Sequence, residues 1–288
     1  MRSGFAAVAG RPNVGKSTLV NALTGTKVAI VSHKPHTTRH RIRGVHTSGD
    51  AQLVLVDLPG WQKPIDTLTE RMQDRVHETM ADDIDVVLLV LSARERIGAG
   101  DRYVARSVFA LGVPVLIALN KIDRLKQGHV ATQIKTAATL GAFHALHPVS
   151  ALTGDGIGEL RSDLISLLPD GPLLYPAGTD TDMPLEARIA ELVREQALRL
   201  TKEEVPHAIT AEVVEIDEGR VHVRLYTETE SQKQILIGKG GTMVREIGRG
   251  ARPHVEALMG GRRIYLQLQV KAAPKWRRNQ TMLERLGL

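Results

Sequence analysis

Short apolar runs alternate with longer stretches of helical periodicity along the first part of the chain, up to about Leu168. The runs are FAAVAG, QLVLVDLPG, DVVLLVLSA, VPVLIALNK and HALHPVSA, and four of them carry a polar or glycine-rich element at the carboxyl end. Such alternation is typical of an open, mostly parallel α/β sheet with helices on both faces and a ligand crevice at the carboxyl ends of its strands. We therefore predict one α/β domain over residues 1–170.

The pattern changes after this domain. Residues 171–184 are rich in Pro, Gly and Asp and show no periodicity, which is typical of a linker. The next segments predict a helix, a hairpin around DEGR, two short helices joined by the glycine-rich turn in QILIGKGGTMVREIG, and a last strand, RRIYLQLQV. This order, αββααβ, predicts a smaller α+β domain over residues 185–288. The apolar stripe of its first helix comprises Leu185, Ile189, Leu192, Val193, Ala197 and Leu200.

Composition narrows the class of protein. Aromatic residues make up only 3% of the chain, so Val, Ile, Leu and Ala must build the cores. The absence of cysteine excludes disulfides, thiolate zinc sites and thiol nucleophiles, and it suits a reducing compartment. The longest apolar runs are too short to span a bilayer, and the first one indicates a strand and not a signal peptide. We expect a soluble cytoplasmic protein.

Charge is distributed unevenly over the second domain. Residues 178–232 hold six Lys and Arg against thirteen Asp and Glu, whereas residues 233–288 hold twelve against three. The net charge of the whole chain is +6. A basic end favours a polyanionic partner, but a solvated face explains the same run of charge equally well until a binding motif is found inside it.

A phosphate-binding motif lies near the start of the chain. Gly10, Gly15, Lys16 and Ser17 match G-x-x-x-x-G-K-[ST] between a predicted strand and a predicted helix. Glycines let backbone N–H groups close around phosphate oxygens, Lys16 would reach the β and γ phosphates, and Ser17 would bind Mg²⁺. The motif alone indicates any nucleoside triphosphate. The loop residues that we predict to contact it are Gly10, Arg11, Pro12, Asn13, Val14, Gly15, Lys16, Ser17 and Thr18.

A second motif, D-x-x-G, ends the strand LVLV. It comprises Asp57, Leu58, Pro59 and Gly60. Its place after a phosphate-binding loop puts Asp57 near the metal, through water, and the Gly60 N–H where it would contact a γ phosphate. Taken alone the motif is an ordinary turn sequence, so its position in the chain carries the interpretation.

A third motif selects the base. Asn120, Lys121 and Asp123 follow the run VPVLIAL, and the Asp123 carboxylate would accept hydrogen bonds from N1–H and the exocyclic N2 amine of guanine. Adenine lacks both donors, and a buried acceptor left unpaired costs about 1 to 3 kcal/mol. The sequence therefore predicts guanine nucleotides. Three residues at the end of the fifth run would support the base: Ser150, Ala151 and Leu152.

These elements, in this order and spacing, resemble the motifs of the P-loop GTPases over roughly the first 170 residues. The polar stretch SHKPHTTRHRIRG resembles the first switch segment of the TrmE, Era and EngA group, whose Thr-Arg pair places a threonine on Mg²⁺ when the γ phosphate is present. By that match Thr38 is the ligand, with Thr37 as the alternative. The predicted metal ligands are thus Ser17, Thr38 and Asp57.

The position after D-x-x-G is Trp61, where many GTPases have a glutamine that orients the attacking water. An indole cannot do this, so we expect slow intrinsic hydrolysis. In relatives an asparagine of the loop helps to hold a potassium ion, and Asn13 stands at that position. The resemblance implies catalytic roles for Lys16, Thr38, Gly60 and Asn13.

The basic end contains a G-x-x-G turn. Flanked by αββ and αβ, it resembles the turn of a type II KH domain, which lets a nucleic-acid backbone approach closely. The residues that we predict to bind RNA are Gly238, Lys239, Gly240, Gly241, Arg245, Lys271, Lys275, Arg277 and Arg278, with Arg249 and Arg252 as further phosphate contacts. Ile237, Ile247 and Ile264 are groove or core residues, with core favoured. Trp276 would stack on a base or cap the core.

One GTPase domain, a linker and a KH-like unit ending in VKAAPKWRR resemble the Era family over nearly the whole chain; EngA proteins carry two GTPase domains, and only one phosphate-binding loop is present here. The resemblance implies a cytoplasmic, monomeric GTPase that uses Mg²⁺ and binds the 3′ end region of 16S rRNA to assist maturation of the small (30S) subunit. It also implies peripheral membrane association in some relatives. Leu58, in place of the usual threonine, and the turn interior Lys239-Gly240 depart from the family pattern.

Two alternatives from other functional classes stay open. One is a GTP-sensing RNA-binding module in which hydrolysis is incidental. The other is a GTPase at the membrane surface that uses its basic face on anionic lipid, although no amphipathic Lys-rich helix stands out.

Overall fold

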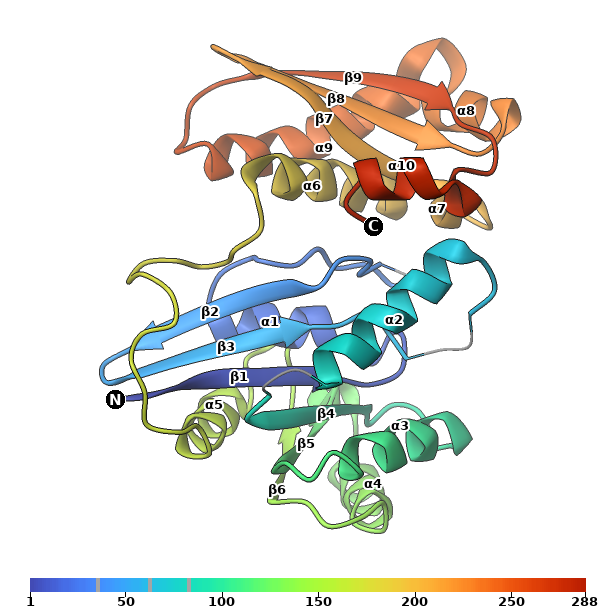
Figure 1. The fold of residues 1–288 in the computed structure, drawn as a ribbon. Helices are drawn as coiled ribbons and strands as arrows, with labels where there is room; N and C mark the ends of the chain where they lie inside the picture. Colours follow the sequence, from blue (N-terminus) through green and yellow to red (C-terminus); the bar gives the residue numbers. More distant parts are fainter. Residues whose placement is uncertain (35–36, 62–63, 82–83) are drawn as a thin grey trace. The chain divides into compact units, whose positions relative to one another are not determined.

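The computed structural model describes residues 1–34, 37–61, 64–81 and 84–288, which form two compact units (Figure 1). The first unit comprises residues 1–29, 38–64 and 71–182. The second comprises residues 183–288 together with two short segments of the first half of the chain, 30–37 and 65–70. The first of these segments ends directly before Thr38, and the second begins five residues after Gly60.

The first unit is built on a six-stranded sheet with the strand order β2-β3-β1-β4-β5-β6. Only β2 runs antiparallel to its neighbour, so the predicted mostly parallel sheet is confirmed. Every residue of β3, β4 and β5 is buried, as expected for strands covered on both faces. The strands are β1 (Arg2–Ala9), β2 (Ile42–Ser48), β3 (Ala51–Asp57), β4 (Val86–Ser92), β5 (Val115–Asn120) and β6 (Ala145–Val149).

Helices cover both faces of this sheet. Residues of α2, α3 and α4 join β1, β4 and β5 in one apolar core, whereas α1 and α5 contact each other and pack on β1 and β3. The helices are α1 (Lys16–Thr24), α2 (Thr67–Ala81), α3 (Ala99–Phe109), α4 (Gln127–Ala137) and α5 (Ile157–Ser166), with a short 3₁₀ turn η1 (Ile122–Arg124). The sheet register places Val8 beside Asp57, and Asn120 beside both Ser92 and Val149. The carboxyl ends that carry the predicted motifs therefore meet at one edge.

Strand β2 was not predicted. Its sequence, IRGVHTS, follows a run of cationic residues, and only Ile42, Gly44 and Val45 are buried in it. It lies at the edge of the sheet, where a strand needs one apolar face only.

The segment 171–182, which we name the strap, runs along this edge of the first unit and is drawn in yellow in Figure 1. Thr181 forms an antiparallel bridge with Gly44, and the Val45 N–H donates to the Asp180 carbonyl at 2.8 Å. Arg43 forms an ion pair with Asp182 at 3.0 Å. Although its composition is that of a linker, the strap is bound to the rest of the first unit by specific contacts.

The second unit follows the predicted order αββααβ. Its three strands have the order β7-β8-β9, with β8 antiparallel to β7 and parallel to β9. The elements are α6 (Leu185–Leu200), α7 (Val205–Ala208), β7 (Thr210–Asp217), β8 (Arg220–Thr227), α8 (Glu230–Ile237), η2 (Lys239–Gly241), α9 (Thr242–Leu258), β9 (Tyr265–Ala272), η3 (Trp276–Arg278) and α10 (Gln280–Arg285). Helices α6, α8 and α9 enclose an apolar core with the sheet, so the predicted α+β architecture is confirmed.

Helix α6 is buried on more sides than its predicted stripe requires. Ile189, Val193 and Ala197 of the stripe are fully buried, but its end residues Leu185 and Leu200 are exposed. Between these ends the helix also buries Glu191, Arg194, Glu195 and Gln196.

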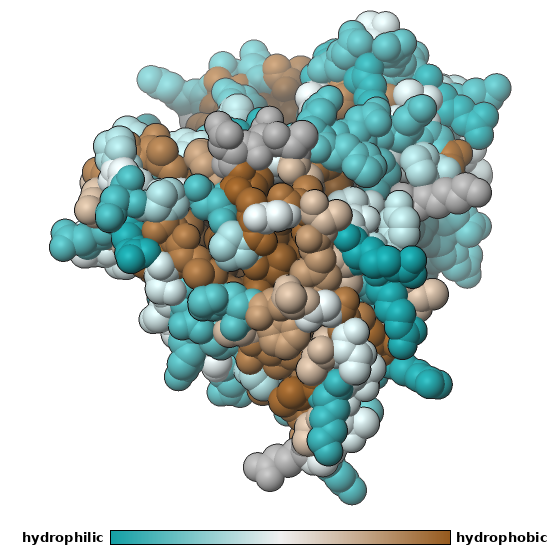
Figure 2. All heavy atoms as spheres, turned by 60° about the horizontal axis from the view of Figure 1, so that its bottom comes forward, coloured by the Kyte–Doolittle hydropathy of each residue, from teal (hydrophilic) through white to brown (hydrophobic). Residues whose placement is uncertain are grey.

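The surface is mostly polar, with local exceptions. Figure 2 shows a group of apolar side chains in the middle of the face turned forward, with hydrophilic side chains around it. Large apolar side chains exposed by more than half are scattered along the chain: Ile65, Tyr103, Leu152 and Tyr265. In the described part of the chain, no helix is both long and apolar enough to cross a membrane.

Candidate nucleotide and nucleic-acid sites

The phosphate-binding loop joins the end of β1 to the start of α1, as its motif predicts. Gly10 and Gly15 both have positive φ, 155° and 100°. A Cβ on Gly10 would lie 2.6 Å from the Val90 carbonyl oxygen, and one on Gly15 would lie 2.4 Å from the Asn120 side-chain nitrogen. Glycine is therefore required at both positions by backbone conformation and by space.

Lys16 is the first residue of α1 and is almost completely buried, with 7% of its surface exposed. Its Nζ donates hydrogen bonds to the carbonyls of Gly10 at 3.2 Å and Arg11 at 3.1 Å, so it lies across the loop. Burial lowers the pKa of Lys16 to about 8, and the nearby Asp57 carboxylate opposes this shift. A phosphate oxygen in the loop would stabilise the charged ammonium further, as expected for a triphosphate ligand.

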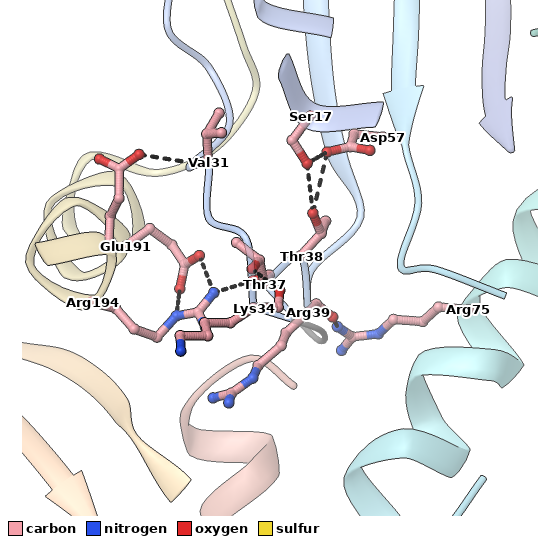
Figure 3. Close-up of polar contacts among 11 residues, drawn as sticks. Ser17, Val31, Lys34, Thr37, Thr38, Arg39, Asp57, Arg75, Glu191 and Arg194 are labelled. Atoms are coloured by element: carbon pink, nitrogen blue, oxygen red, sulfur yellow. Dashed lines mark hydrogen bonds and ion pairs between the residues drawn. The ribbon is translucent and has the colours of Figure 1, made fainter. Parts of the chain in front are cut away.

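Side-chain oxygens of Ser17, Thr38 and Asp57, from three separate segments, converge on one another (Figure 3). The Ser17 hydroxyl lies 2.8 Å from the Thr38 hydroxyl and donates to the Asp57 carboxylate at 2.7 Å. The Thr38 hydroxyl also donates to Asp57, at 3.4 Å. The Thr37 hydroxyl does not join them, because it donates to the Lys34 carbonyl at 2.7 Å.

The donor set fits Mg²⁺, a hard cation that takes oxygen ligands and keeps several waters. Asp57 is fully buried, and its second carboxylate oxygen, Oδ1, has no hydrogen-bond partner among the described residues. Burial raises the pKa of Asp57, while Lys16, Ser17 and Thr38 counteract the shift. A buried carboxylate with an unused oxygen is the feature that a cation or its bound water would satisfy.

The D-x-x-G turn packs directly against the phosphate-binding loop. A Cβ on Gly60 would lie 2.9 Å from the Pro12 backbone nitrogen, so only glycine fits there. Trp61 is 8% exposed, belongs to the core of the first unit, and meets the His77 ring edge-on with the ring centroids 5.7 Å apart. Leu58 is buried in the same core. The indole is thus a core residue and does not replace a water-orienting amide.

Asn120, at the end of β5, ties three loops together. Its side-chain nitrogen donates to the Val14 carbonyl of the phosphate-binding loop at 3.1 Å. Its side-chain oxygen accepts from the backbone N–H of Ala151 at 3.0 Å and of Lys121 at 2.8 Å. The asparagine therefore has a structural reason to occupy this position, because both ends of its amide are used.

The other residues predicted for the base lie around Asn120. Ser150 is the first residue after β6, and its hydroxyl donates to the Asp123 carboxylate at 3.0 Å. This hydrogen bond orients the carboxylate. The Lys121 ammonium contacts the Asn13 carbonyl, and burial lowers the pKa of Lys121. Leu152 is 73% exposed. The structure thus brings the three motifs to one edge of the sheet, with Leu152 at its solvent side.

Contacts around the site include residues that no motif indicated. Arg11 forms an ion pair with the buried Asp101 of α3 at 2.7 Å and a second with Glu95 at 3.2 Å. The Gln73 side chain of α2 donates to the Gly60 carbonyl at 3.1 Å. These side chains come from distant positions whose spacing carries no signal, so sequence reasoning could not find them.

The G-x-x-G turn of the second unit forms the short helix η2 between α8 and α9. Gly238, Gly240 and Gly241 have φ values of 74°, 60° and 79°, a region that favours glycine. Lys239 is exposed at this turn, and Arg245 of α9 donates to the Gly240 carbonyl at 2.9 Å. Backbone and positive charge are both accessible here.

The other predicted RNA-binding cations divide into two groups. Exposed ones are Arg249, Arg252, Lys271, Lys275 and Arg278. Arg277 is different, because it forms ion pairs with Glu228 at 2.6 Å and Asp66 at 3.3 Å. Its guanidinium is used within the second unit.

The structure decides between the alternatives for several apolar residues. Trp276 is completely buried, and its indole N–H donates to the Ala208 carbonyl at 2.8 Å, so it caps the core. Ile247 and Ile264 are also core residues. Ile237, the last residue of α8, is partly buried beside the glycine turn.

Two family models match the chain. Residues 5–121 match the model described as a 50S ribosome-binding GTPase, and residues 203–277 match that of the KH domain. Among curated proteins, GTPase Era of Mycobacterium tuberculosis H37Rv is 44% identical over 99% of this chain and 98% of its own length. GTPase Era of Mycobacterium sp. KMS is 43% identical with the same coverage.

Solved structures agree over the same length. An Era variant of Aquifex aeolicus bound to GDP and AlF₄⁻ is 36% identical and superposes with a TM-score of 0.95, covering 100% of this chain and 99% of that one. A structure of Era with MgGDPNP and nucleotides 1506–1542 of 16S ribosomal RNA has a TM-score of 0.94 at 36% identity and the same coverage. The likeness therefore extends over both units.

Proposed function

Because the chain belongs to the Era family of GTPases and hydrolyses GTP to GDP and phosphate, we propose that it is a GTP-controlled RNA-binding protein of small-subunit assembly. Residues 1–170 are the GTPase domain, 171–184 the connection, and 185–288 the KH domain. The RNA is the 3′ end region of 16S rRNA, and the protein assists maturation of the 30S subunit. Support comes from the related structure that holds both a GTP analogue and this RNA.

The observation that carries the proposal is the presence of two built sites in one chain. One is the buried cluster of Ser17, Thr38 and Asp57 beside Lys16, which fits a triphosphate with Mg²⁺. The other is the glycine turn with exposed Lys239, which fits a nucleic-acid backbone.

In this function the residues of the first unit have separate tasks. Lys16 and the loop N–H groups hold the β and γ phosphates, and Asp123 accepts from the guanine edge. Ser17, Thr38 and Asp57 would hold Mg²⁺, Asp57 through water, and the bound metal would supply positive charge where negative charge develops on the phosphates. Since Trp61 lies in the core, no glutamine at that position orients water, and we expect slow hydrolysis without a partner.

Asn13 is proposed as a potassium ligand. It adopts a left-handed backbone conformation, with φ of 65°, and its side chain is exposed at the loop. If it binds potassium, the hydrolysis rate at saturating Mg²⁺ is higher in K⁺ than in Na⁺, and Asn13→Ala removes that difference. Equal rates in the two salts for the unmodified protein would exclude this role.

We propose that the protein acts as a monomer in the cytoplasm. Peripheral association with the inner face of the membrane is the alternative use of the basic surface. Flotation with anionic vesicles in the absence of RNA measures it directly.

The proposed function is tested by RNA affinity at fixed salt. A fragment from the 3′ end of 16S rRNA is titrated against protein loaded with GDP and, separately, with a non-hydrolysable GTP analogue. We expect tighter binding in the GTP form, because the γ phosphate and Mg²⁺ order the segment around Thr38. Equal affinities would mean that the KH domain binds RNA independently and that GTP controls another step.

A further inference from the structure

The segment that carries the two candidate threonines is divided between the two units. Residues 30–37 belong to the second unit, and Thr38 belongs to the first. Within the second unit, helix α6 holds this segment at both ends (Figure 3). The Glu195 carboxylate accepts from the Val31 N–H at 2.8 Å, and the Arg194 guanidinium donates to the Thr37 carbonyl.

Arg194 is a charged side chain that is buried and held in one orientation by several hydrogen bonds. It is 1% exposed, and the neighbouring Glu191 binds it through two parallel hydrogen bonds, each 2.7 Å long, from Nε and Nη2. The remaining nitrogen, Nη1, is buried without a hydrogen-bond partner among the described residues. Apolar residues of similar size often replace a buried ion pair with no loss of stability, so stability alone does not explain this pair.

The contact with the Thr37 carbonyl has a direct consequence for Thr38. A carbonyl group and the next residue's N and Cα lie in one rigid plane, so fixing the carbonyl oxygen orients the backbone of the following residue. The hydroxyl of Thr38 then lies 2.8 Å from Ser17 and 3.4 Å from Asp57. The carbonyl that Arg194 binds and the backbone nitrogen of Thr38 thus belong to the same rigid peptide group.

We propose that Arg194 is a positioning residue for Thr38 and, through it, determines how well the protein distinguishes GTP from GDP. The inference rests on the proposed function in one respect, namely that Thr38 binds Mg²⁺ when the γ phosphate is present. GDP lacks the γ phosphate, so on the same premise its binding does not depend on Thr38. Glu191 contributes by holding the guanidinium in the required orientation.

The test replaces Arg194 by methionine, which fills similar space but cannot donate a hydrogen bond. Affinities for GDP and for a non-hydrolysable GTP analogue are measured over a series of Mg²⁺ concentrations, without RNA. We expect about tenfold weaker binding of the analogue at low Mg²⁺, the loss expected for one charge-assisted hydrogen bond, with recovery as Mg²⁺ rises. GDP affinity should change by less than about twofold.

Three further variants keep the test decisive. Arg199→Met is the matched control, because Arg199 is exposed on the same helix. Glu191→Met with Arg194→Met removes both charges, so that no unpaired carboxylate is buried, and should show the same selective loss. Arg194→Lys should recover part of it, since one ammonium N–H can still reach the Thr37 carbonyl.

Two results would overturn the proposal: unchanged discrimination in the Arg194→Met protein, or an equal loss for both nucleotides, which would indicate a structural role only. These results are independent of the RNA titration. A normal response of RNA affinity to nucleotide with unchanged discrimination in the variant rejects the role of Arg194 alone. If RNA affinity does not respond to the nucleotide but the Arg194→Met protein loses discrimination, the coupling to RNA is rejected and the positioning role of Arg194 is retained.

Discussion

The side chain of Gln52 binds both backbone groups of Tyr175: its oxygen accepts the Tyr175 N–H at 2.9 Å, and its nitrogen donates to the Tyr175 carbonyl at 2.9 Å. The same oxygen accepts from the Leu174 N–H at 2.8 Å, and the same nitrogen donates to the Thr47 hydroxyl at 2.9 Å. Gln52 is completely buried. One amide therefore anchors the strap to β3.

Gln52→Ala should lower the free energy of unfolding by about 2 to 4 kcal/mol, because it removes a buried amide together with its four hydrogen bonds and leaves three part-buried backbone groups without these partners. Urea denaturation measures the loss, and proteolysis within 171–182 should become faster. Thr47→Val, which removes one of the four hydrogen bonds, is the graded control. A loss below about 1 kcal/mol would show that water replaces the amide at little cost.

Lys16→Ala should weaken the binding of GTP and GDP by about 100-fold or more, because it removes the ammonium that lies across the phosphate loop. Titration with a fluorescent nucleotide measures this. Binding of RNA by the nucleotide-free variant serves as the control for folding of the second unit. Retained nucleotide affinity would contradict the assignment of the loop.

Asp123→Asn should reduce affinity for GTP by about 100-fold and raise that for xanthosine triphosphate. Xanthine carries a carbonyl oxygen in place of the guanine amine, and an asparagine amide can donate to it. Competition between the two nucleotides measures the exchange of preference. If both affinities fall together, the side chain supports the loop and does not read the base.

Gly240→Asp should weaken RNA binding by about tenfold at low salt while nucleotide affinity stays unchanged. Gly240 has a φ of 60°, which aspartate tolerates, and a Cβ there would meet no atom within 4 Å. The fold should therefore persist with an added negative charge at the turn. Gly260→Asp, with a φ of 76° and equally open space beyond the end of α9, is the matched control. Equal losses in both variants would mean that net charge, and not the turn, decides binding.

Trp276→Phe should lower stability by about 1 to 2 kcal/mol and leave RNA affinity unchanged. The indole is buried, and its N–H satisfies the Ala208 carbonyl. Thermal unfolding and the RNA titration are measured on the same samples. Weaker RNA binding at unchanged stability would instead indicate stacking on a base.

The parallel sheet and the three motif loops could be predicted because each is a local pattern. Continuous apolar runs such as β4 are buried on both faces, and Gly15 and Gly60 are fixed by clashes that any side chain would cause. Strand β2 and the strap could not be predicted in this way. Both segments are held by contacts between distant positions: Gly44 pairs with Thr181, and Gln52 binds the backbone of the strap. Such contacts leave no periodic pattern in the sequence.

The charged residues of the second unit show a different limit of sequence reasoning. Nothing in the sequence around Arg194 and Arg277 distinguishes these arginines from solvent-exposed ones. Arg194 is nevertheless buried against Glu191, and Arg277 is paired with Glu228. Whether an arginine faces water or a carboxylate depends on which segments meet at it, and a single sequence does not record that.

The amide of Asn120 has a consequence for how a ligand is assembled in the site. Because this one side chain joins the phosphate loop at Val14 to the base-side loop at Ala151, we expect order imposed on one loop to be transmitted to the other. Guanosine and inorganic pyrophosphate, offered as separate fragments, should therefore bind with positive cooperativity, each lowering the entropy that the other must remove. The intact nucleotide should therefore bind more tightly than two independent binding sites for its base and its phosphates would allow.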